Sequence, residues 1–96
     1  MEEISLIEFN KLKEEQKSFI VLYYLKNNII SELASFNLEK INTEIDIPIY
    51  KISLSNNHFD QALPVITIYE KGCLKSRLIG FHNLSYTRSY IEKIFV

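Results

Sequence analysis

The sequence is poor in cysteine, with Cys73 the single example among its 96 residues. One thiol cannot close an intramolecular disulfide, so a disulfide-stabilised framework is excluded. We interpret Cys73 as an ordinary half-buried residue, because free cysteine behaves as a small apolar side chain. The alternatives are a modifiable thiol or a disulfide to another chain.

Glycine is also scarce, and no charge of one sign accumulates. Two glycines cannot build a glycine-rich phosphate loop. Eleven lysine and arginine residues stand against 12 aspartate and glutamate residues, interspersed for a net charge of −1. Nucleic acids and anionic membranes are recognised by clustered positive charge, so the sequence predicts neither partner. No apolar run approaches the ~20 residues of a membrane span.

Three further absences bear on location and chemistry. The chain starts Met1-Glu2-Glu3, without the basic and apolar regions of a secretory signal, so a cytoplasmic protein is expected. His58, His82 and Cys73 match no zinc-ligand spacing. We therefore expect no metal site and no cofactor.

The composition is sufficient for a folded core. The sequence is 47% hydrophobic and 12% aromatic. A chain of this length forms one domain, so residues 1–96 are predicted to fold around a single core.

Local patterns predict alternating strands and helices. Ser5 and Glu8 have the spacing of a capping box, and Leu6, Phe9 and Leu12 follow at helical spacing. The continuous apolar run over 18–25 is typical of a strand buried on both faces. The predicted elements are a short strand over 2–4, a helix over 6–16, a strand over 18–25, a helix over 29–44, a strand over 49–54, a helical turn within 58–63, a strand over 65–69, a turn at 70–72, a strand over 73–79 and a helix over 86–95 capped by Ser85.

This order predicts an α/β fold of three layers. A helix between the strands at 18–25 and 49–54 requires a parallel crossover, and the turn at Gly72 joins the last two strands into a hairpin. The expected architecture is a mixed sheet of four to five strands, with helices on both faces and a C-terminal β-hairpin and helix.

In this order and spacing, the chain resembles the thioredoxin family. The segment Leu63-Pro64-Val65 is similar to the family's Ile-Pro-Thr segment, in which a cis bond precedes the proline. Gly80 matches a family glycine at the end of the last strand, and Tyr24 matches the aromatic before the active loop. The resemblance implies a thioredoxin-like three-layer sandwich over the whole chain.

The reactive groups of that family are missing here. Asn28 and Ser31 occupy the positions that correspond to the two cysteines of Cys-x-x-Cys, and neither forms a thiolate or a disulfide. Lys51 resembles the family's buried lysine, but Leu22 stands in place of its aspartate partner. The loop from Ser55 to Leu63 is shorter than the resemblance implies.

The leading hypothesis is a redox-inactive protein- or peptide-binding module. Asparagine is a favoured helix N-cap, so the structural interpretation of Asn28 is a cap. The functional interpretation is a peptide-binding face, and no catalytic residue is predicted. The candidate binding residues are Tyr24, Asn27, Asn28, Ser31, Leu63 and Pro64. The alternatives are a structural homodimer and, from another class, a redox protein that uses Cys73 as a single thiol.

Overall fold

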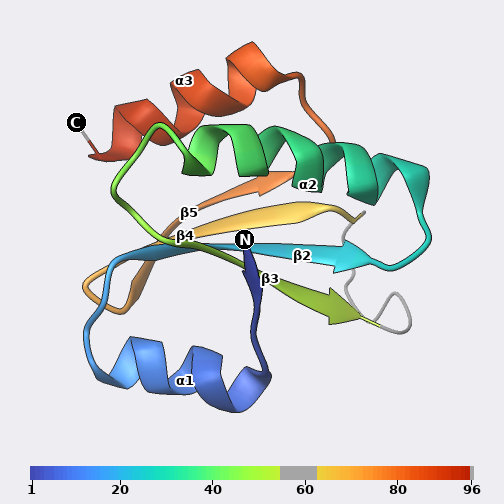
Figure 1. Cartoon of the computed structure of the whole chain (residues 1–96). Coiled ribbons are helices and arrows are strands. Elements are labelled where there is room, and N and C mark those ends of the chain that lie inside the picture. The colour runs from blue at the N-terminus through green and yellow to red at the C-terminus, as the bar shows by residue number, and fades with distance from the viewer. Residues whose placement is uncertain (55–62, 96) are drawn as a thin grey trace.

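The computed structural model describes residues 1–54 and 63–95 of the chain (Figure 1). It contains five strands and three helices: β1 (Glu2–Glu3), α1 (Leu6–Glu14), β2 (Phe19–Leu25), α2 (Ile29–Asn42), β3 (Ile49–Leu54), β4 (Val65–Glu70), β5 (Cys73–Ile79) and α3 (Leu84–Phe95). The predicted order of elements is confirmed. The helical turn predicted within 58–63 falls, apart from Leu63, outside the described residues.

The strands form one mixed sheet in the order β1-β3-β2-β4-β5. β2 runs parallel to β3 and antiparallel to β4, and β5 returns antiparallel beside β4. The parallel crossover through α2 and the C-terminal hairpin are therefore as predicted. β2 lies at the centre of the sheet, and the residues from Phe19 to Tyr24 are all buried, as its continuous apolar run predicts.

Helices cover both faces of the sheet, which gives the three predicted layers. α2 and α3 lie side by side over one face, and α1 lies over the other (Figure 1). The core under α2 and α3 contains Ile20, Leu22, Leu38, Ile68 and Ile91. The core under α1 is aromatic, and the Phe9 ring meets the rings of Phe19 and Tyr69 edge-on at centroid distances of 6.0 and 5.3 Å.

α1 begins with the predicted capping box and ends at Glu14, two residues earlier than expected. The Ser5 hydroxyl accepts from the Glu8 amide, and the Glu8 carboxylate accepts from the Ser5 amide, both at 3.1 Å. Phe9 is buried, whereas the Leu6 side chain is 60% exposed. A helix turns about 100° per residue, so residues spaced by three drift sideways and cannot all face the sheet.

α2 ends at Asn42 rather than at residue 44, and it buries only some of its apolar side chains. The buried positions recur at three- and four-residue spacing: Ser31, Ala34, Leu38 and Ile41. Four large apolar side chains of the same helix face solvent: Ile29, Ile30, Leu33 and Phe36. Apolar content alone therefore does not identify the packed face of α2.

α3 starts earlier than predicted because Asn83, rather than Ser85, provides its cap. The Asn83 side-chain oxygen accepts from the Tyr86 amide at 2.8 Å. The predicted inward residues are confirmed: Ile91 is buried, and Tyr90, Ile94 and Phe95 pack on the same core.

The hairpin between β4 and β5 turns at Lys71 and Gly72. Both residues have positive φ, 52° and 83°, as the mirror-image turns of β-hairpins require. The Gly72 amide donates to the Lys17 carbonyl at 2.8 Å. This bond joins the hairpin to the chain that leaves α1.

Candidate functional site

Two asparagines, Asn27 and Asn28, determine the conformation of the loop between β2 and α2. Asn27 has φ 61°, a left-handed conformation that asparagine tolerates better than most residues. Asn28 is extended, and its Oδ1 accepts from the Ser31 amide at 3.0 Å. Asn28 is thus the predicted helix cap. Asn27 and Asn28 are both exposed, so they form the accessible part of this loop.

Ser31 lies beneath this loop and not on its rim. Its side chain is 0% exposed, and its Oγ accepts from the Leu25 amide at 3.2 Å. The expectation that Ser31 forms a polar peptide-binding rim is therefore wrong, because its hydroxyl already serves the backbone. Sequence reasoning missed this role because the bond joins the strand before the loop to the helix after it.

Leu63 and Pro64 lie beside the carboxyl end of β2. Val65 pairs with Tyr23, which places the two preceding residues level with the last residues of β2. The Leu63–Pro64 peptide bond is cis. Pro64 is buried, and its carbonyl accepts from the Gly80 amide at 2.8 Å. Its side chain is consequently not a surface that a partner can touch.

Leu63 differs from Pro64 in having backbone groups to offer. Its side chain is partly buried against the aromatic core under α1. Within residues 1–54 and 63–95, its N–H and C=O have no hydrogen-bond partner. These backbone groups lie beside the last residues of β2, the strand that leads into the loop before α2.

Tyr24 points away from the loop and toward β1. Its ring is buried, and its hydroxyl donates to Glu3 Oε1 at 2.6 Å. Burial, reinforced by the Glu3 carboxylate, raises the pKa of Tyr24 to about 12. The Tyr24 hydroxyl bond lowers the pKa of Glu3, against the opposing effect of burial. Tyr24 supports the site from below and does not project from it as an anchor.

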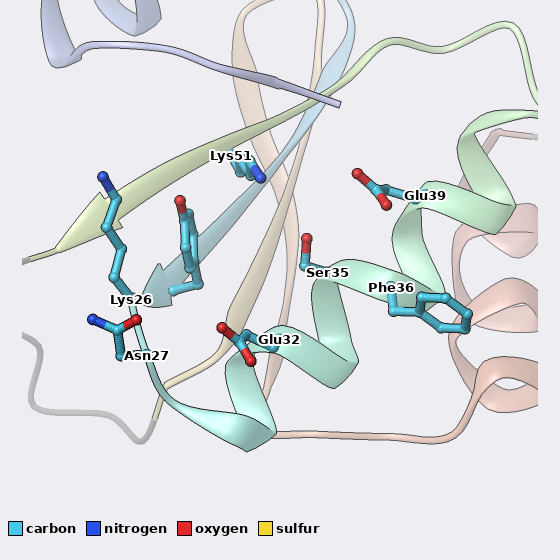
Figure 2. Close-up of a pocket in the computed structure, with 8 residues that line it drawn as sticks. Lys26, Asn27, Glu32, Ser35, Phe36, Glu39 and Lys51 are labelled. Carbon is cyan, nitrogen blue, oxygen red and sulfur yellow. The ribbon is translucent and has the colours of Figure 1, made fainter.

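Lys51 is brought under α2 by the register of the central strands. Leu22 pairs with Lys51 across β2 and β3, so the lysine and its apolar neighbour are adjacent, as the resemblance implies. The Lys51 ammonium lies 5.5 Å from the centre of the Tyr24 ring. Figure 2 shows Lys51 in a pocket whose opposite wall is α2. Sequence reasoning noticed the lysine but not the cavity.

Cys73 and the histidines do not join this site. Cys73 is exposed, which corrects the expectation of a half-buried thiol. It is the first residue of β5, at the hairpin end of the sheet, whereas Leu63 and Asn28 lie at the opposite end. His82 stacks on Tyr86 at 4.7 Å, and His58 lies outside the described residues.

The described part of the chain contains neither a metal-binding cluster nor a membrane-spanning helix. Residues 1–54 and 63–95 contain no group of three His, Cys, Asp or Glu side chains that could hold a metal ion. Over the same residues, no helix combines the length and apolarity that crossing a membrane requires.

Comparison with solved structures establishes the fold. Chloroplastic thioredoxin z superposes with a TM-score of 0.79 at 23% identity, covering 99% of this chain and 94% of that one. This chain has the thioredoxin fold. Thioredoxin from Aeropyrum pernix gives a TM-score of 0.73 at 21% identity, with coverage of 95% and 84%. Thioredoxin from Trypanosoma brucei brucei gives 0.80 at 18% identity, with coverage of 97% and 88%.

Sequence comparison adds nothing to this likeness, since the sequence matches no family model and no curated protein. On the thioredoxin fold, Asn28 caps α2 and Ser31 lies three residues further along. The single cysteine of the chain is on β5. The chain therefore carries no cysteine pair at the start of α2.

Proposed function

We propose that this thioredoxin-fold domain is a redox-inactive binding module for an extended protein or peptide segment. The observation that carries the proposal is the pair of backbone groups on Leu63, which face no partner among the described residues. An extended segment binds such groups by β-augmentation, in which main-chain hydrogen bonds supply the affinity. The exposed side chains of Asn27 and Asn28 lie at the neighbouring loop.

The chemistry of the loop supports binding over disulfide exchange. Exchange needs an attacking thiolate and a second thiol, and the carboxamide of Asn28 and the hydroxyl of Ser31 supply neither. We therefore expect no disulfide reductase activity at this loop. Activity in a disulfide-reduction assay that survives Cys73→Ser would contradict that expectation. A cytoplasmic location is part of the same proposal.

An apolar surface extends from this loop onto α2. Ile29, the first residue of the helix, is 73% exposed, and Leu33 one turn later is 45% exposed. An apolar side chain of the partner would find contact on these two residues. The proposal therefore predicts a segment that combines an extended backbone with at least one apolar residue.

The experiment compares partner capture by variants that are matched in charge. Asn27→Lys and Ile29→Lys place a cation on exposed positions of the proposed face without removing the Asn28 cap. Ile7→Lys is the control, since Ile7 is 82% exposed on α1, across the sheet. We expect a partner recovered with the wild type and Ile7→Lys to be lost with the other two variants. Equal recovery with all four proteins would place the interface elsewhere.

A structural homodimer is the second candidate, and the exposed apolar residues of α2 favour it. Leu33 and Phe36 are 45% and 56% exposed in a single copy, and a second copy would bury them. Sedimentation velocity across a hundredfold range of concentration tests this candidate. Monomers at every concentration would exclude it, whereas a dimer broken by Leu33→Lys would favour it over the peptide-binding module.

A further inference from the structure

A cavity of about 410 Å³ lies between α2 and the strands β2 and β3 (Figure 2). Its volume falls within the ~300–1,000 Å³ range of small-molecule sites. It is lined by Tyr24, Lys26, Asn27, Glu32, Ser35, Phe36, Glu39 and Lys51. Among these residues, only Asn27 belongs to the accessible part of the proposed peptide-binding face.

Two of the four charged groups in this cavity already have partners. The Lys26 ammonium lies 3.8 Å from Glu3 Oε2, and Glu39 Oε1 lies 3.9 Å from the N-terminal ammonium. Lys51 and Glu32 have no ion pair within the described residues. Lys51 helps to lower the pKa of Glu3, after the larger effect of the hydrogen bond from Tyr24, and Glu32 is exposed to solvent. The cavity thus holds one cation and one anion that lack a direct ion pair.

These two charges come from different walls of the cavity. Lys51 reaches from β3 toward α2, whereas Glu32 is carried by the first turn of α2 (Figure 2). Lys51 is half-buried, and its ammonium lies over the face of the Tyr24 ring. A carboxylate would form a charge-assisted hydrogen bond with the Lys51 ammonium.

The charge pattern selects against ligands with a single charge. A simple anion that reaches Lys51 also meets the carboxylates of Glu32 and Glu39, and a simple cation that reaches Glu32 meets two lysines. Repulsion of this kind is how a site rejects the wrong ligand. A molecule that carries both charges satisfies Lys51 and Glu32 together. The Tyr24 ring, which lines the same cavity, provides apolar contact.

We propose that this cavity binds a small zwitterion of the α-amino-acid class. Its carboxylate pairs with Lys51, its ammonium pairs with Glu32, and the Ser35 hydroxyl supplies a hydrogen bond from the same wall. This binding is separate from the proposed capture of an extended segment at Leu63, and neither depends on the other.

The test titrates the ¹⁵N-labelled protein with L-norvaline and with two derivatives that each lack one charge. Norvaline has an unbranched apolar side chain that can pack on the Tyr24 ring. N-acetylnorvaline has no ammonium, and norvaline methyl ester has no carboxylate. We expect saturable shifts of the amide signals of Lys51, Glu32 and Ser35 with norvaline, at dissociation constants of about 1 mM. Each derivative should bind about tenfold more weakly, because a charge-assisted contact is lost.

Variants assign the two charges to their partners. Lys51→Met should abolish the norvaline shifts, and Glu32→Gln should remove the preference for norvaline over N-acetylnorvaline. Lys17→Met and Glu14→Gln are matched controls that do not line the cavity, and they should leave both ligands unaffected.

Three results would overturn the proposal. These are no saturable shift with norvaline, equal binding of norvaline and N-acetylnorvaline, or norvaline binding that Lys51→Met leaves intact. If a variant fails to fold, the comparison of the three ligands on the wild type still decides. Partner capture at Leu63 is measured separately, so failure of one proposal is distinguishable from failure of the other.

Discussion

The hydroxyl of Ser31 accepts a hydrogen bond from the backbone amide of Leu25 at 3.2 Å, in a position that is 0% exposed. The bond ties the last residue of β2 to the first turn of α2. The Ser31 oxygen therefore has a structural role in this chain. This hydrogen bond fixes both ends of the loop that carries the exposed side chains of Asn27 and Asn28.

Removing this oxygen should destabilise the fold. Ser31→Ala leaves the partly buried Leu25 amide without its partner, which costs about 1–3 kcal/mol in the free energy of unfolding. Urea denaturation followed by circular dichroism measures the change. Ser89→Ala, at an exposed position of α3, is the control and should change stability by less than about 0.5 kcal/mol. Equal effects of the two substitutions would contradict a structural role for Ser31.

Truncation of the two leucines of α2 should destabilise the fold to very different extents. Leu38 is 0% exposed, whereas Leu33 is 45% exposed on the other side of the same helix. Leu38→Ala should cost about 2–5 kcal/mol, because it removes buried apolar contact and leaves a cavity. Leu33→Ala should stay within about 0.5 kcal/mol, as is usual for the surface. Chemical denaturation of both variants tests which face of α2 is packed.

The two glycines should differ in their tolerance of alanine. Both have positive φ, 83° at Gly72 and 82° at Gly80. A Cβ at Gly72 would stand 2.3 Å from the Lys13 carbonyl oxygen, whereas a Cβ at Gly80 meets nothing within 4 Å. Gly80→Ala should therefore cost only the left-handed backbone penalty of about 1–2 kcal/mol. Gly72→Ala should cost clearly more, and thermal unfolding ranks the two.

The Glu3 carboxylate should contribute a pH-dependent part of the stability. Its pKa is lowered in the folded state, mainly by the hydrogen bond from Tyr24. The contribution is therefore present above the unfolded-state pKa and is lost as the pH falls through the folded-state value. The stability difference between the wild type and Glu3→Gln should shrink from pH 7 to pH 3. In a Tyr24→Phe background, urea titrations should show a smaller pH dependence of that difference.

Tyr24 should contribute stability that is lost as the pH rises, whereas the contribution of Glu3 is lost as the pH falls. Burial is the main reason why the pKa of Tyr24 is raised to about 12, and the Glu3 carboxylate raises it further. A raised pKa stabilises the fold below the unfolded-state value near 10, and that contribution is lost as the pH rises through 12. The tyrosinate absorbance that Tyr24→Phe removes should develop near pH 12. Development near pH 10 would show that the Tyr24 hydroxyl is not held as described.

The sequence by itself determined the order of elements and most of their ends. The capping box of Ser5 and Glu8, the turn at Gly72 and the buried run of β2 each depend on residues close together in the chain. Local hydrogen bonds and backbone conformation decide such features, so short patterns predict them. Asn28 was recognised as a helix cap for the same reason.

Only the tertiary structure decided which side chains are buried and which charges meet. The packed face of α2 depends on where the sheet lies, so Ser31 is buried while Ile29 is exposed. Glu3 reaches Tyr24 across 21 residues of sequence, and strand register places Lys51 beside Leu22 beneath α2. The cavity that holds Lys51 and Glu32 arises between a strand and a helix, because contacts between separate elements are set by packing rather than by sequence spacing.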